Sequence, residues 1–301
     1  MKVVVLAGGT GGAKLASGFQ ELLSPGDLTV IANTADDDEF WGLLVSPDVD
    51  ATIYRLAGVF DESVGYGQKG DTFSTLDALG RLGEPTWFRI GDRDLATHVL
   101  RAEMLNRGCR LTETALELGR RFGLATRVLP VTDDKVRTHF VTESGTLSFQ
   151  EYFVREHLAP PLHGIDIRGG DSAQPTAEVT EALAHADLVV IGPSNPLISI
   201  APILKVIGRL LPRERTVAVT PIVGGAALKG PTIEMLRALG FDASPAEVAR
   251  MYQAEAGTFV LDSRDAGGAP EIEAMGYRVL VSDTVMADGG GGLARAIAEL
   301  F

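Results

Sequence analysis

Cysteine is nearly absent from this chain, since Cys109 is the only one among 301 residues. A single cysteine excludes a disulfide framework and a thiolate metal site, because both need several thiols. Long apolar runs are also missing, and none reaches the roughly 18 consecutive residues that a membrane helix needs. The first apolar run, Val3–Leu6, is too short for a signal peptide, and glycines follow it at once. We therefore expect a cytoplasmic protein with no membrane partner.

Positive charge is scarce as well. The chain has 27 Lys and Arg against 40 Asp and Glu, a formal net charge of −13. This balance argues against a nucleic-acid partner, which would need clustered basic residues. A small anionic ligand would need backbone amides, a few basic side chains or a divalent cation to offset the repulsion.

What the chain does contain is an alternation of short β-branched runs and helical patterns, which is typical of an α/β fold. The predicted strands are Val3–Ala7, Leu28–Ala32, Arg127–Val131, Leu188–Gly192, Val217–Thr220, Phe259–Asp262 and Arg278–Val281. The predicted helices are Ala13–Leu23, Thr176–Ala186, Ile198–Leu211, Thr232–Leu239, Pro245–Ala256 and Gly291–Phe301. We predict a Rossmann-like, doubly wound, mostly parallel sheet in a single domain spanning residues 1–301.

Two regions depart from this alternation. Residues 61–122 have mostly helical patterns and little strand signal, so we expect an inserted helical subdomain. Val136–Thr142 and Leu147–Val154 are separated by a short turn sequence and predict a β-hairpin beside the main sheet.

The glycine-rich stretch LAGGTGGAKL matches neither common nucleotide motif. Ala13 separates Gly12 from Lys14, which a P-loop does not allow. Lys14 also takes the place of the third glycine of the dinucleotide fingerprint, and the second strand ends in Asn33 rather than an acid. The amides of this stretch could still bind an anion at a helix N-terminus, with Lys14 adding charge. The alternative is a tight turn that binds nothing.

An acidic segment, NTADDDEFWGLLVSPDVD, follows the second predicted strand. Its aspartates are Asp36, Asp37, Asp38, Asp48 and Asp50. They are expected at the carboxyl edge of the sheet beside the glycine loop, where hard carboxylate oxygens suit Mg²⁺. In an extended stretch, Asp48 and Asp50 would face the same side. The alternative interpretation is a solvated acidic loop.

Four further segments carry polar groups. IGPSNP and TPIVGGAALKGP each follow an apolar run and could present amides at the sheet edge. RIGDRDLATH places charges at a helix start, where His98 is expected on the helix face, and VTDDKVRTHF could be an ordinary turn at Asp133 and Asp134. No arrangement of an activated protein nucleophile is apparent.

Seven motifs in order resemble the 2-phospho-L-lactate transferase family (CofD or FbiA type) over essentially the whole chain. They are LAGGTGGAKL, NTADDDEFWGLLVSPDVDATIY, RIGDRDLATHVLR, VTDDKVRTHFVT, FQEYFV, IGPSNP and TPIVGGAALKGP. The resemblance implies an enzyme of coenzyme F420 biosynthesis. Its donor is a guanosine diphosphate (GDP) carrying lactate or enolpyruvate, its acceptor is the ribityl hydroxyl of the deazaflavin Fo, and GMP leaves. It also implies Mg²⁺ dependence and a homodimer.

The resemblance also implies roles for matched residues. Asp36 and Asp48 match magnesium ligands, and Asp50 and Arg89 match deazaflavin-binding positions. Asp50 is in addition the candidate catalytic residue, orienting or deprotonating the acceptor hydroxyl. The donor-nucleotide side is matched by Gly8, Gly9, Thr10, Gly11, Gly12, Lys14, Ser194 and Asn195. Tyr66 stands where relatives often have tryptophan, which puts a stacking contact with the acceptor in doubt.

Two other functions compete with this one. A YvcK-like regulatory protein that binds nucleotide sugars would share the fold and a glycine loop, but the acidic segment and GDRDLATH favour the enzyme. An NAD-linked oxidoreductase is disfavoured because the ribose-binding acid is missing.

Overall fold

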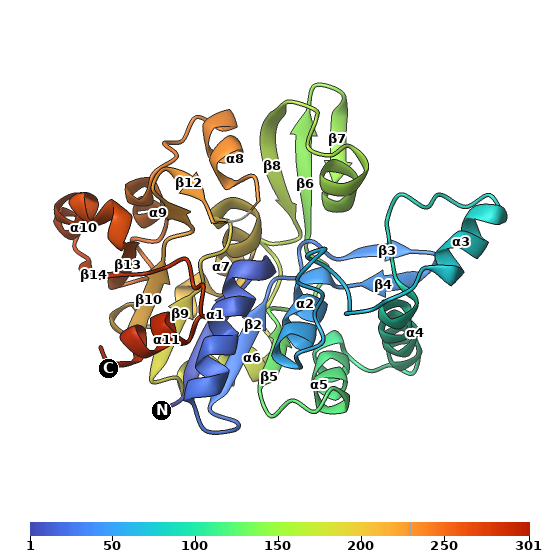
Figure 1. The fold of residues 1–301 in the computed structure, drawn as a ribbon, viewed down its shortest axis with the longest axis horizontal. Helices are drawn as coiled ribbons and strands as arrows, with labels where there is room; N and C mark the ends of the chain where they lie inside the picture. Colours follow the sequence, from blue (N-terminus) through green and yellow to red (C-terminus); the bar gives the residue numbers. More distant parts are fainter. Residues whose placement is uncertain (229) are drawn as a thin grey trace.

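The computed structural model describes residues 1–228 and 230–301, and within them the centre of the fold is a seven-stranded parallel sheet (Figure 1). The strand order is β14-β13-β10-β9-β1-β2-β5. The strands are β1 (Val3–Ala7), β2 (Leu28–Ala32), β5 (Arg127–Pro130), β9 (Leu188–Ile191), β10 (Thr216–Val219), β13 (Thr258–Asp262) and β14 (Arg278–Ser282). Each predicted strand is confirmed to within one residue at either end.

Helices cover both faces of this sheet. One face is covered by α1 (Gly9–Leu22), α2 (Pro47–Leu56), α5 (Leu111–Arg121) and α11 (Gly291–Ala298). The other is covered by α6 (Ala177–Ala184), α7 (Ala201–Ile207), α8 (Thr232–Ala238), α9 (Pro245–Met251) and α10 (Ala269–Ala274). Val3 and Val5 of β1 face the first layer, and Val4 and Leu6 face the second. Burial on both sides explains why these strands are continuous apolar runs, and it confirms the doubly wound fold.

The order of the strands reverses direction at β1. The chain runs from β1 through β2 to β5 on one side, and then from β9 through β10 and β13 to β14 on the other. β1 therefore lies between β2 and β9, parallel to both. In open parallel sheets, ligands bind outside the carboxyl ends of the strands at such a reversal. In this chain, residues 8–12 follow β1 and residues 192–195 follow β9, so both segments lie at this reversal.

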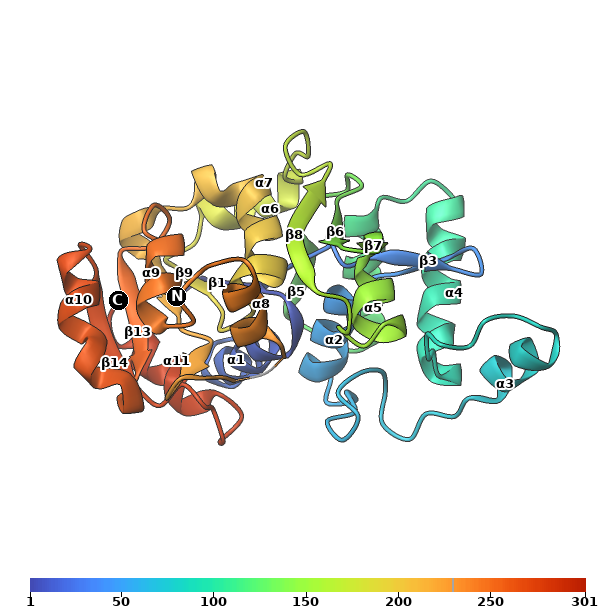
Figure 2. The same ribbon diagram turned by 90° about the horizontal axis from the view of Figure 1, so that it is seen from above.

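The region 61–122 contains α3 (Ser74–Arg81) and α4 (Asp92–Asn106), and then α5. α3 lies at the opposite end of the molecule from α10 in both views (Figures 1 and 2). Leu76 is the residue that α3 buries. Within the described residues, no helix is both long enough and apolar enough to cross a membrane.

A three-stranded antiparallel sheet, in the order β7-β6-β8, stands beside the main sheet. It contains β6 (Arg137–Thr142), β7 (Gly145–Ser148) and β8 (Leu162–Arg168). The hairpin is confirmed, but its second strand ends at Ser148, because Glu151–Arg155 form a π-helical turn. This turn allows Tyr152 and Phe153 to pack against Phe140, with the rings of Phe140 and Tyr152 stacked 4.4 Å apart. β8 was not predicted.

The remaining elements are short. Two small hairpins pair β3 (Asp38–Phe40) with β4 (Leu43–Val45), and β11 (Ile222–Val223) with β12 (Ala226–Ala227). Short helical turns are formed by Pro196–Ile200, Gly208–Leu210, Arg213–Arg215 and Ser263–Gly268. The lysine of TPIVGGAALKGP, at position 229, lies outside the described residues.

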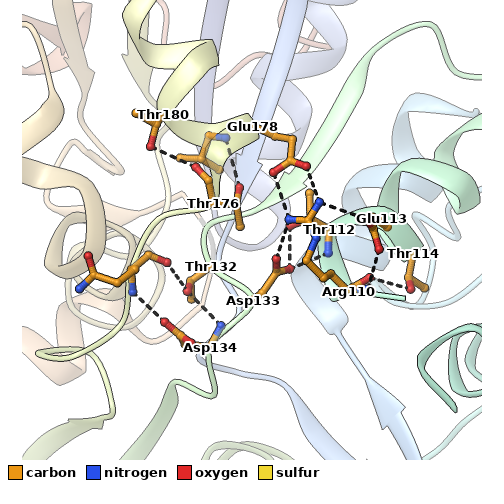
Figure 3. A network of polar contacts seen from close by, with 12 residues as sticks. Arg110, Thr112, Glu113, Thr114, Thr132, Asp133, Asp134, Thr176, Glu178 and Thr180 are labelled. Atoms are coloured by element: carbon orange, nitrogen blue, oxygen red, sulfur yellow. Dashed lines mark hydrogen bonds and ion pairs between the residues drawn. The ribbon is translucent and has the colours of Figure 1, made fainter. Parts of the chain in front are cut away.

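The two aspartates of VTDDKVRTHF have structural partners, as Figure 3 shows. Asp133 accepts hydrogen bonds from the amide and hydroxyl of Thr112 in the first turn of α5, both at 2.8 Å. Arg110 donates to Asp133 at 3.1 Å and to Glu178 of α6 at 2.6 Å. Asp134 accepts a hydrogen bond from the backbone N–H of Gln174 at 2.8 Å. These contacts tie β5, α5 and α6 together, and they agree with the prediction of a turn.

Candidate functional site

The glycine loop forms the first turn of α1, which begins at Gly9 rather than at the predicted Ala13. Gly9 has a φ of +70°, a conformation that favours glycine. A Cβ on Gly11 would lie 2.2 Å from the carbonyl oxygen of Pro193. A Cβ on Gly8 would lie 2.5 Å from the Cβ of Ser199. The glycines therefore allow the start of α1 to approach the segment that follows β9.

Two amides of this turn already have partners. Gly9 N–H donates to Asp48 Oδ1 at 2.6 Å, and Gly12 N–H donates to Ser194 Oγ at 3.2 Å. A carboxylate therefore occupies the anion position at the N-terminus of α1, where the helix dipole favours negative charge. Thr10 lines the adjacent cavity. Lys14 is half-buried.

Asp48 and Asp50 lie in the first turn of α2, so the expectation of an extended stretch is wrong. Ser46 and Pro47 start this helix, and Pro47 suits its first position because a first-turn residue needs no N–H. Asp48 Oδ2 accepts a hydrogen bond from Asn33 Nδ2 at 3.0 Å. Asp48 therefore lies between the end of β2 and the start of α1.

Asp36 and Asp48 form a buried pair of acidic side chains. Burial, followed by the charge of Asp48, raises the pKa of Asp36 well above its ordinary value. Burial also raises the pKa of Asp48 to about 6, against the hydrogen bonds from Asn33 and Gly9. Asp36 Oδ1 is buried and has no hydrogen-bond partner among the described residues. Two carboxylates in this state suit a hard divalent cation, which would relieve their repulsion.

The described residues contain no group of three or more His, Cys, Asp and Glu side chains that could hold a metal ion. A cation at Asp36 and Asp48 would therefore complete its shell with water and substrate oxygens, as Mg²⁺ commonly does. Asp37 and Asp38 make other contacts. Asp37 accepts from Ser46 Oγ at 2.7 Å, and Asp38 accepts from Ser148 Oγ at 3.2 Å.

Asp50 of α2 lies against two polar side chains of α4. Arg101 donates from Nη2 to Asp50 Oδ1, and His98 Nδ1 lies 3.7 Å from Asp50 Oδ2. His98 Nε2 lies 3.4 Å from Oδ1 of Asp94, which also accepts from the Tyr54 hydroxyl at 2.7 Å. Burial raises the pKa of Tyr54 well above its ordinary value, so its hydroxyl keeps the proton that it donates. Asp50 Oδ2 has no hydrogen-bond partner in the described part of the chain.

A cavity of about 410 Å³ opens above this group. Its lining includes Gly9, Thr10, Asp48, Asp50, Tyr54, Tyr66, Trp87, Phe88, Arg89, Asp94, His98 and Gln150. Phe88 stacks on Phe40 with ring centroids 3.9 Å apart, which fixes one aromatic wall. The guanidinium of Arg89 lies 4.2 Å from the ring centroid of Phe73. The cavity therefore combines aromatic walls with a carboxylate at its base.

The structure brings Asp48, Asp50 and Arg89 to this one cavity. Ser194 and Asn195 follow β9 and are not among the residues that line this cavity. Asn195 Oδ1 accepts from Leu197 N–H at 2.9 Å and so starts the helical turn that follows. Their proposed role in donor binding, like that of the glycine loop, stays a prediction.

The sequence reasoning missed Arg101, Asp94 and Tyr54, and it placed His98 on a helix face without a role. The spacing of Asp94, His98 and Arg101 was the available signal, because residues three and four apart share one face of a helix. That face is buried: Arg101 is 1% exposed, as is His98. Such burial of polar groups marks a functional or structural network, but it cannot be read from one sequence.

Comparison with known proteins assigns the family. The family model described as 2-phospho-L-lactate transferase CofD matches residues 3–282. A 2-phospho-L-lactate transferase of Methanosarcina acetivorans is 39% identical over 286 residues, covering 94% of this chain and 93% of that protein. A phosphoenolpyruvate transferase of Streptomyces griseus is 39% identical over 298 residues, covering 96% and 94%.

The fold is also found among solved structures. A UPF0052-family protein of Bacillus halodurans superposes with a TM-score of 0.63, covering 99% of this chain and 98% of that one, at 17% identity. At that identity the likeness shows a shared fold and nothing about function. The family match over nearly the whole chain and the two relatives at 39% identity agree with each other. This chain belongs to the 2-phospho-L-lactate transferase family.

Proposed function

We propose that this protein is a transferase of coenzyme F420 biosynthesis. It moves a phospholactyl or phosphoenolpyruvyl group from a GDP-linked donor to the ribityl hydroxyl of Fo, and it releases GMP. Relatives named for either transfer are equally similar to this chain, so the acid group stays open between the two. We propose further that it acts in the cytoplasm as a homodimer.

One observation carries the proposal: a single cavity is lined both by aromatic rings and by the acidic residue Asp50. Trp87 and Phe88 provide aromatic surface for a flat ring system, and Arg89 stands beside them. Asp50 offers a carboxylate for the hydroxyl chain of such a ligand. A flat acceptor that carries a hydroxyl chain suits both features.

The reaction then requires little covalent chemistry from the protein. The ribityl oxygen attacks the outer phosphorus of the donor, and its proton passes to the Asp50 carboxylate and then to solvent. A new O–P bond forms, the bond from that phosphorus to the bridging oxygen breaks, and the electron pair leaves with GMP. Positioning and charge neutralisation supply most of the acceleration in such transfers.

Asp36 and Asp48 are the residues that would hold Mg²⁺, and the unpartnered oxygen of Asp36 supports this assignment. When bound, the ion would neutralise phosphate charge beside an acidic protein surface. The chain's own contribution on the donor side is the start of α1, where Thr10, Gly11 and Lys14 stand beside the reversal point of the sheet.

The test is to incubate the purified protein with Fo, Mg²⁺ and guanylylated lactate, enolpyruvate or glycerate, followed by mass spectrometry. We expect a phosphodiester of Fo only when donor and Mg²⁺ are both present. Product that forms equally well in excess chelator would remove the metal assignment. If no donor reacts and the protein binds a nucleotide sugar but not Fo, the regulatory alternative replaces the enzyme.

A further inference from the structure

A buried arginine on α4 contacts Asp50. Arg101 is 1% exposed, and its Nη2 donates to Asp50 Oδ1. Burial acts to lower the pKa of Arg101, but the adjacent Asp50 carboxylate outweighs it, so the pKa is raised and the guanidinium stays charged. Asp50 is itself 3% exposed. The pair is therefore a buried ion pair at the base of the cavity.

The other terminal nitrogen of the guanidinium, Nη1, has different partners. Arg101 Nη1 donates to the Leu44 carbonyl at 3.2 Å and lies 3.1 Å from His98 Nδ1. Arginine usually holds a carboxylate through two parallel hydrogen bonds, which would engage both of its oxygens. Because Leu44 and His98 take Nη1, Arg101 holds only one oxygen of Asp50. Oδ2 is buried and has no hydrogen-bond partner in the described part of the chain.

The arginine also fixes the role of one nitrogen of His98. A guanidinium can only donate, so Nδ1 of His98 accepts from Arg101 and does not donate to Asp50. Nε2 of His98 lies 3.4 Å from Asp94 Oδ1. Among the described residues, Arg101 is therefore the side chain that donates to the Asp50 carboxylate.

We infer that Arg101 is a positioning residue for the transfer: its hydrogen bond to Oδ1 orients the Asp50 carboxylate in the lining of the cavity, where the acceptor would bind. The inference rests on the proposed function. Arg101 lies beneath Asp50 and does not line the cavity, so it acts through Asp50 rather than on the acceptor. Its loss should reduce the rate of transfer and leave the binding of Fo largely intact.

The experiment compares Arg101→Met, Arg101→Lys, Asp50→Asn and the double variant Arg101→Met/Asp50→Asn. Each is measured for kcat, for KM of Fo, and for Fo affinity by fluorescence titration. Arg110→Met is the matched control, because Arg110 also binds several acids but lies in the network of Figure 3. Thermal melting shows whether each variant folds.

We expect Arg101→Met to lower kcat by on the order of 10²-fold, as for a misplaced reacting group, with Fo affinity nearly unchanged. Arg101→Lys should recover part of this loss, because it restores the charge but not the planar fork. In the Asp50→Asn background, Arg101→Met should cause almost no further loss, because the two residues act as one unit. The control should keep the wild-type kcat.

Three results would overturn the inference: an unchanged kcat in folded Arg101→Met, a loss of Fo affinity with kcat retained, or losses that multiply in the double variant. If Arg101→Met does not fold, the kcat of Arg101→Lys is the test. A wild-type kcat in Arg101→Lys would refute the requirement for the planar guanidinium. A wild type that makes no product refutes the proposed function and this inference with it. An active wild type whose Arg101 variants keep their kcat refutes this inference alone.

Discussion

Asp37 gives a direct test of the electrostatics of the acidic segment. It is 3% exposed, and burial raises its pKa from its ordinary value of 3.8 to about 7, against the opposing charge of Arg137 and the hydrogen bond from Ser46. The folded carboxyl thus holds its proton more tightly than the unfolded one. Its contribution to stability is present at low pH and is lost as the pH rises from about 4 through about 7.

The size of this effect follows from the pKa. A tenfold change in proton affinity corresponds to about 1.4 kcal/mol, so a rise from 3.8 to about 7 corresponds to roughly 4 kcal/mol in full. Of this, about 3 kcal/mol should be lost between pH 5 and pH 8. Asp37→Asn removes the ionisation and keeps an oxygen that can accept from Ser46 Oγ. The variant should therefore gain stability relative to wild type as the pH rises.

The assay is urea unfolding of metal-free wild type and Asp37→Asn at several pH values from 5 to 8. The measured quantity is the difference in unfolding free energy between the two chains, followed as a function of pH. The free-energy cost of burying the amide is the same at every pH and therefore does not affect this change. Glu39→Gln is the matched control, since Glu39 is a neighbouring acid with a largely exposed side chain. The reasoning would be refuted if the difference in unfolding free energy between wild type and Asp37→Asn did not change with pH. It would also be refuted if the difference between wild type and Glu39→Gln changed by as much.

The remaining predictions concern the site and its scaffold. Asp48→Asn should lower activity, with part of it recovered at high Mg²⁺, whereas Asp50→Asn should lower kcat by on the order of 10²–10⁴-fold without such recovery. Equal recovery in a Mg²⁺ series would show one undivided acidic site. Arg89→Ala should weaken Fo binding and leave GDP binding nearly normal, as checked by two fluorescence titrations; an equal loss of both would contradict its assignment. Gly11→Ala should destabilise the fold by about 1–3 kcal/mol in thermal unfolding, because its Cβ would meet the Pro193 carbonyl oxygen at 2.2 Å. An unchanged melting temperature would show that the turn can relax.

The central sheet was predictable because its strands are buried on both faces. A strand such as Val3–Ala7 must then be apolar at every position, and a continuous apolar run bounded by glycine is easily recognised. β8 lacks this signal, because Leu162–Arg168 is buried at one end only and otherwise alternates with polar residues. The strand predicted through Val154 was wrong for a related reason: Phe149, Tyr152 and Phe153 have helical spacing, and their packing on Phe140 decides the conformation.

The candidate site was predictable in its motifs but not in its contacts. Asp50 stands out in the sequence because it lies in an acidic segment after a strand. Arg101 does not, because an arginine in a helix is usually solvent-exposed. Only the packing of α4 against β4 and α5 shows that this arginine is buried, and only its hydrogen bond shows that it is directed at Asp50. Pairings between residues 51 positions apart are set by tertiary structure, which local spacing does not encode.

Asp48 joins the two motifs that the sequence presents separately. It comes from the first turn of α2, yet it accepts the Gly9 amide at the start of α1 and the side chain of Asn33 at the end of β2. A carboxylate at that amide stands where the phosphate of a donor would otherwise bind. Two anions cannot share the position without a positive charge between them, and the buried carboxyl group of Asp36 lies nearby. The geometry of the glycine loop thus gives a reason for the proposed cation that is independent of the count of acidic residues: a divalent ion bound by Asp36 and Asp48 would let phosphate approach a helix start that the chain's own carboxylate already occupies.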